Sequence, residues 1–167
     1  MYAAIPTGGG KMWTLSHRFW EALRLWPIYA VGAGIAIHGL GWLLAGEPWL
    51  LDQAANERLL QVSYSELLAA ETNRHLGDYL TALYRFFGWW IVVIGLLVLA
   101  FAFATKLETT VSKVYFFIVM GVTLMGLVIL QIRFIPTTPF LWTTYALGSL
   151  LALSLFASFR TKWDVQP

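Results

Sequence analysis

Cysteine and charge are what this 167-residue sequence has least of: it contains no cysteine, and lysine, arginine, aspartate and glutamate together make up only 12%. The absence of cysteine excludes disulfides, thiolate catalysis and cysteine-ligated clusters. The formal net charge of +2 is too small to indicate a nucleic-acid partner. The motifs HExxH and GxSxG, the Walker A loop and the dinucleotide fingerprint are also missing, so no catalytic residue is predicted.

Hydrophobic residues, by contrast, make up 59% of the chain and include nine tryptophans. A membrane hydrocarbon core about 30 Å thick needs about 20 apolar residues in a helix. Four runs approach that length, at residues 27–46, 83–104, 114–132 and 140–159. A helix satisfies its own backbone hydrogen bonds in lipid, and the alternation of a barrel strand is absent. We therefore predict an all-α fold, an integral membrane four-helix bundle forming a single transmembrane domain over residues 1–167.

Positive charges flank these spans unequally. One side carries Lys11, Arg18, Arg24, Lys106, Lys113, Arg160 and Lys162, and the other carries Arg58, Arg74, Arg85 and Arg133. Because cytoplasmic span ends are enriched in lysine and arginine, both termini are predicted to be cytoplasmic. The predicted location is a bacterial inner membrane.

Residues 12–25 have an amphipathic pattern. Their apolar residues recur at helical spacing, whereas Arg18, Glu21 and Arg24 cover much of the remaining surface. The apolar positions are Trp13, Phe19, Trp20 and Leu23, followed by Trp26. This pattern predicts an N-terminal interfacial helix lying among lipid headgroups. An aromatic belt that leads directly into the first span is an equally open interpretation.

The only sizeable segment outside the membrane is the outer loop, residues 47–82. Pro48 suits the start of a helix. Ser63 and Glu66 have the spacing of a capping box, which predicts a second helix start. We therefore expect short helices over the outer mouth of the bundle.

Arg85 stands where the second span begins. On a helical projection it shares a sector about 100° wide with Gly88 and Gly95. Glycines mark close helix approach in membranes, so this sector is predicted to face the bundle. Gly34 and Gly41 lie on the same stripe of the first span as His38, and they too are predicted to pack helices together.

The best candidate ligand site is a cluster of polar residues beneath the outer loop, rimmed by tryptophan. Its members are His38, Asp78, Arg85, Gln131, Arg133, Trp42 and Trp89. Such side chains suit the oxygens of a quinone ring or a lipid headgroup. The structural alternatives are a neutral His38 bonded to a neighbouring span, and an Arg85 that anchors the span at the interface. Bound lipid or quinone is the candidate ligand, but no cofactor is required.

No metal site is predicted. A b-type haem would need two axial ligands, and the three histidines, His17, His38 and His75, lie on at least two membrane levels. Haem is therefore disfavoured.

The span order, with GEPWLLD after the first span and YRFFGWWIVVIGLLVLAF opening the second, resembles the DoxX-like group of small four-helix membrane proteins over residues 27–160. The resemblance implies a helix-packing role for Arg85 and Gly88 and carries over no catalytic residue. Some members of that group are implied to be membrane subunits of quinone-linked oxidoreductases.

Two functions are consistent with these observations. The first is a non-catalytic accessory subunit of a larger membrane-protein complex, which would have membrane lipids and other integral membrane subunits as partners. The alternative is a quinone- or lipid-binding component of an oxidoreductase. Because no redox centre can be assembled from these residues, the composition favours the accessory subunit, and enzyme activity is not expected.

Overall fold

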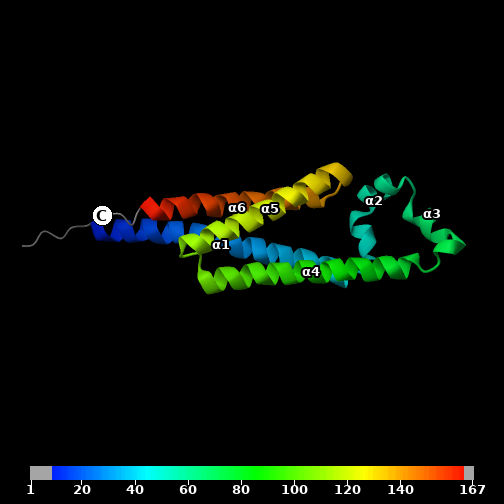
Figure 1. Cartoon of the computed structure of the whole chain (residues 1–167), viewed down its shortest axis with the longest axis horizontal. Helices are drawn as coiled ribbons and strands as arrows, with labels where there is room; N and C mark the ends of the chain where they lie inside the picture. Colours follow the sequence, from blue (N-terminus) through cyan, green and yellow to red (C-terminus); the bar gives the residue numbers. More distant parts are fainter. Residues whose placement is uncertain (1–8, 164–167) are drawn as a thin grey trace, which may run out of the picture.

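The chain folds into four long helices joined by a helical loop and two tight turns (Figure 1). The structure is a computed structural model that describes residues 9–163, with side chains described over residues 17–160. The long helices are α1 (Gly9–Leu44), α4 (Leu76–Thr105), α5 (Thr110–Phe134) and α6 (Phe140–Trp163). Each contains a stretch long and apolar enough to cross a membrane. The prediction of an all-α fold with four helices long and apolar enough to span a membrane is therefore confirmed.

Helix α1 lies between α4 and α6 and packs along both, as Figure 1 shows. Helix α5 crosses this row, and within the described part of the chain α6 is the only long helix that its backbone approaches extensively. An apolar core joins the helices near the end of the bundle where α1 begins and α6 ends, here called the terminal end. Its buried residues are Ile28, Val98, Ala102, Leu107, Phe116 and Leu151.

The first helix differs from the prediction. The predicted interfacial segment is helical, but it is not a separate helix, because α1 continues through Pro27 to Leu44. Arg24, expected on the polar surface, is buried with only 7% of its surface exposed. The physical reason is that Arg24 shares a helix face with Ile28, which packs into the core, and its carbonyl accepts a hydrogen bond from Ser154 of α6. Trp13 lies outside the described side chains.

Glycines allow α1 and α4 to touch backbone to backbone. A Cβ atom added at Gly88 would lie 2.8 Å from the Gly39 carbonyl oxygen, and one added at Gly95 would lie 2.5 Å from the Ala36 amide nitrogen. No side chain fits at such distances, so Gly88 and Gly95 pack helices together, as predicted.

On α1, the closest approach uses different glycines from those predicted. Gly39 and Gly32 face α4, where added Cβ atoms would meet α4 atoms at 2.6 Å and 2.8 Å. Gly34 faces Leu147 of α6 at 3.2 Å, whereas a Cβ at Gly41 would meet nothing within 4 Å. The packing prediction for Gly41 is therefore wrong. The stripe through His38 faces away from α4. It could not be assigned from the sequence because α1 packs against two helices, and residue spacing does not say which side of α1 meets which helix.

The outer loop folds into short helical pieces at the opposite end of the bundle, here called the loop end. They are η1 (Pro48–Asp52), α2 (Gln53–Leu60), α3 (Tyr64–Ala69) and η2 (Glu71–Asn73). Ser63 caps α3 by accepting a hydrogen bond of 3.2 Å from the Glu66 amide, which confirms the predicted helix start. Helix α4 begins at Leu76, seven residues before the predicted span, so it extends beyond α1 at the loop end.

Candidate ligand site at the loop end

A cavity of about 670 Å³, partly open to the outside of the bundle, lies among the four long helices. Its walls are mostly aliphatic, with Ile35 from α1, Ile91 from α4, Leu124 from α5 and Leu147 from α6. Ligand pockets commonly measure about 300–1,000 Å³ and are mostly apolar with a few polar groups. The cavity therefore has the size and lining to hold a hydrocarbon chain.

Apart from Thr123 in the middle of α5, the polar residues that line the cavity lie toward its loop end. His38 and Trp42 lie near the end of α1, and Asp52 ends η1. Gln131 comes from the last turn of α5, and Thr144 from the second turn of α6. With Thr143 of α6, six polar side chains from four elements thus meet at one end of a mostly apolar cavity.

Three of these side chains contain buried polar atoms without a hydrogen-bond partner. They are the Nε1 atom of Trp42, the Oδ1 atom of Asp52 and the Oε1 atom of Gln131. Asp52 and Gln131 have only 4% and 7% of their surfaces exposed. A buried donor or acceptor left unpaired costs about 1–3 kcal/mol, so buried polar groups are almost always paired. Three unpaired atoms at one cavity are the pattern of a site shaped for a polar ligand group.

Asp52 is the functional candidate that the sequence did not reveal. It lies in the acidic outer loop, but η1 folds back so that its carboxylate accepts a hydrogen bond from the Thr138 side chain between α5 and α6. Burial raises the pKa of the Asp52 carboxyl, and the Thr138 hydrogen bond partly opposes this rise. Residue spacing could not predict this contact, because Asp52 and Thr138 are far apart in the sequence. The one available clue is PWLLD, in which Asp52 follows a run of apolar residues.

Aromatic rings surround the polar end. The Phe140 ring lies 4.5 Å from the His38 ring and 5.6 Å from the Trp42 ring, measured between centroids. On the other side, the Tyr84 ring lies 5.0 Å from Trp42, and the Tyr84 hydroxyl accepts a 3.0 Å hydrogen bond from the Asn56 amide. These contacts tie the loop helices to α4 and close the loop end with aromatic surface.

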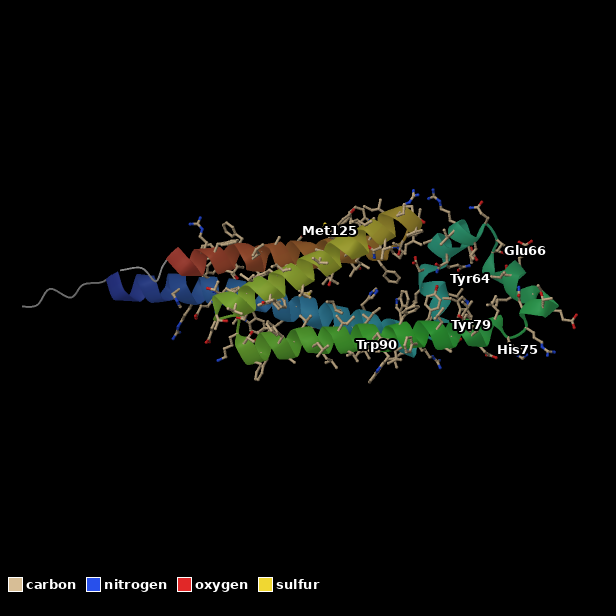
Figure 2. The ribbon with its side chains drawn as sticks, in the orientation of Figure 1. Tyr64, Glu66, His75, Tyr79, Trp90 and Met125 are labelled. Carbon is tan, nitrogen blue, oxygen red and sulfur yellow. The ribbon has the colours of Figure 1, made fainter. Side chains whose placement is uncertain are left out.

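Tyr64 continues this aromatic surface into the loop helices, where it is buried with 4% of its surface exposed (Figure 2). Burial raises the pKa of its hydroxyl, and a hydrogen bond with Tyr84 adds to the rise. By contrast, Trp90 and Met125, also labelled in Figure 2, are half exposed or more on α4 and α5. Two of the buried aromatic residues, Trp49 and Tyr64, therefore lie at the loop end, whereas Phe116 belongs to the core near the terminal end.

Of the residues predicted for the site, His38, Trp42 and Gln131 line the cavity. The predicted convergence is wrong for the others. Asp78, Arg85, Arg133 and Trp89 are exposed. The reason for Arg85 is the unequal length of the helices: Gly88 packs at the level of Leu43, and α1 ends at Leu44. Arg85 precedes Gly88 by about one helical turn, so it lies near the level at which α1 ends, and its side chain is exposed.

The histidines do not form a pair. His38 lies at the cavity and His75 is exposed before α4, where its Nε2 accepts a 3.0 Å hydrogen bond from Arg74. His17 lies toward the terminal end, 3.7 Å from Glu21. Over the described residues, no group of three or more histidine or acidic side chains is placed to hold a metal ion.

Comparisons with protein-family models, with curated proteins and with solved structures gave no match. The fold alone therefore defines the class of protein, which is an integral membrane protein with four helical spans. The resemblance to the DoxX-like group stays a prediction, because no family match supports it.

Proposed function

We propose that this membrane protein binds an amphiphilic molecule, a lipid or a quinone, within the bilayer. The observation that supports this proposal most directly is the set of three unpaired polar atoms at one end of an otherwise apolar cavity. An amphiphile is divided in the same way, since its chain would occupy the aliphatic part and its polar head would lie beside the unpaired polar atoms.

The position of the site in the bundle supports the same proposal. The polar residues belong to the ends of the spans, so the head would lie near the membrane surface and the chain would point toward the membrane centre. The binding residues in this proposal are Trp42, Asp52 and Gln131, with His38 at their side.

The test is native mass spectrometry of the protein extracted in mild detergent, comparing the wild type with a cavity-filling variant. Leu147 lines the cavity from α6, so Leu147→Trp should place an indole inside it. Leu153, on the same helix, is 39% exposed and does not line the cavity, which makes Leu153→Trp the matched control. We expect a bound amphiphile on the wild type and on Leu153→Trp, and its loss from Leu147→Trp. Equal amounts on both variants would contradict the proposal.

An accessory role in a larger complex is a second proposal, and helix α5 supports it. Only 11% of its membrane span is buried inside the chain, the smallest share among the four spans of the described residues. Most of α5 is thus available to lipid or to another membrane protein. The same extraction tests this role, because an accessory subunit should migrate with larger membrane proteins. Migration of the chain by itself at every detergent concentration would argue against it.

A further inference from the structure

The unpaired atoms of the cavity differ in hydrogen-bonding type. The Asp52 carboxylate oxygen and the Gln131 amide oxygen are acceptors, whereas Trp42 contributes a single N–H donor. Asp52 and Gln131 are each more than nine-tenths buried, and buried polar groups are almost always paired. The group that would pair these acceptors must donate more than one hydrogen bond.

The charge of Asp52 further restricts the kind of ligand head that fits the cavity. A buried carboxylate needs a positive partner and several hydrogen bonds to remain charged. Thr138 supplies one hydrogen bond. Within residues 17–160, the structure describes no ion pair for Asp52, and the His17–Glu21 pair lies near the terminal end. A ligand that brings positive charge together with N–H donors would meet both needs of Asp52 at once.

The aromatic rings at this end favour the same kind of ligand. Trp42 has Tyr84 at 5.0 Å on one side and Phe140 at 5.6 Å on another, measured between ring centroids. Faces of aromatic rings attract cations, and aromatic walls with a nearby acid are a recurrent way of binding ammonium groups. A carboxylate or phosphate head would instead be repelled by Asp52.

We propose that the cavity takes a single-chain amphiphile with a primary ammonium head. The ammonium group lies between Asp52 and Gln131, donates to both oxygens and faces the aromatic rings. The alkyl chain runs along the aliphatic wall past Ile35 and Leu147. This assignment rests on the proposed function, since it specifies the head of the amphiphile that the cavity binds.

The test compares dodecylamine with 1-dodecanol, which have the same chain and differ in the head. Binding of each probe to the full-length protein in phosphatidylcholine nanodiscs is measured by native mass spectrometry over a range of probe concentrations. Because charge-assisted hydrogen bonds are about twice as strong as neutral ones, dodecylamine should bind at least about ten-fold more tightly than dodecanol.

Two variants test whether Asp52 is the residue that makes dodecylamine bind more tightly than dodecanol. Asp52→Asn should weaken dodecylamine binding about ten-fold while changing dodecanol binding less than about two-fold. Asp78→Asn removes an exposed carboxylate outside the cavity and should leave both affinities unchanged, which controls for the attraction of the amine to surface charge. Retained dodecanol binding also shows that Asp52→Asn is folded.

The outcomes separate the two proposals. Equal affinity for both probes in the wild type, or an equal effect of Asp52→Asn and Asp78→Asn on dodecylamine, would overturn the ammonium assignment and leave amphiphile binding standing. Absence of binding for both probes would overturn the proposed function and the ammonium assignment with it.

Discussion

Replacing Gly95 by alanine tests the contact that holds α1 and α4 together. The new Cβ atom would lie 2.5 Å from the Ala36 amide nitrogen and 2.7 Å from the Gly32 carbonyl oxygen. Carbon contacts are optimal at about 3.5–4.0 Å, so the helices would have to separate by about 1 Å. A gap of that size removes about a quarter to a half of the dispersion attraction of each separated atom pair, and overpacking typically costs about 1–3 kcal/mol.

Helix propensity opposes this loss, because alanine is a better helix former than glycine by about 1 kcal/mol. The variant Gly41→Ala isolates the two effects, since a Cβ there meets nothing within 4 Å and only the propensity gain remains. We therefore expect Gly95→Ala to unfold with a free energy about 1–3 kcal/mol below that of Gly41→Ala. The assay is a denaturing-detergent titration followed by far-ultraviolet circular dichroism. Equal stability of the two variants would refute the packing argument.

Three further predictions concern single side chains. Burial raises the pKa of the Asp52 carboxyl above its usual 3.8, so the folded chain holds this proton more tightly than the unfolded chain, and stability should fall as pH rises from 3.8 through the raised pKa. Asp52→Asn should remove that fall, which thermal unfolding midpoints between about pH 4 and pH 8 would reveal. Ser154→Ala removes a buried hydrogen bond to the Arg24 carbonyl and should lower the unfolding free energy by about 0.5–1.5 kcal/mol in the same detergent titration. Ser149→Ala is the control, because the Ser149 hydroxyl is exposed; it should lower the unfolding free energy by less than about 0.5 kcal/mol, as surface changes usually do. Arg85→Ala should change the unfolding free energy by less than about 0.5 kcal/mol, because its side chain is exposed; a larger loss would support the predicted anchoring role instead.

The spans could be predicted from the sequence because run length and composition decide them. Lipid requires long apolar helices, and four runs meet that need. The start of α4 could not be predicted in the same way. Residues 76–82 carry Asp78 and Tyr79, which are exposed, so the hydrophobic signal begins only where the helix enters the membrane. Helix α4 therefore begins several residues before the apolar run from which the span was predicted.

The candidate site was predicted only in part, for a geometric reason. His38, Trp42 and Gln131 are polar residues within apolar runs, where an inward position is the natural expectation, and they line the cavity. Arg85 was wrongly placed at the site and Asp52 was overlooked, because their surroundings depend on other segments. Exposure of Arg85 follows from where α1 ends, and burial of Asp52 follows from how η1 folds back onto Thr138. Neither relation is encoded in helical spacing.

The crossing of α5 over α6 has a mechanical consequence for the cavity. At the crossing, Leu124 sits against Gly148, where an added Cβ would lie 2.9 Å from the leucine side chain. Nearer the terminal end, Phe116 of α5 stacks on Phe101 of α4 at 5.7 Å between ring centroids. Beyond these two contacts α5 makes few backbone approaches to α1 or α4 within the described chain. Because α5 approaches the backbones of α1 and α4 so little, a tilt of α5 about its crossing with α6 would change the width of the cavity at the loop end without separating the glycine contacts between α1 and α4.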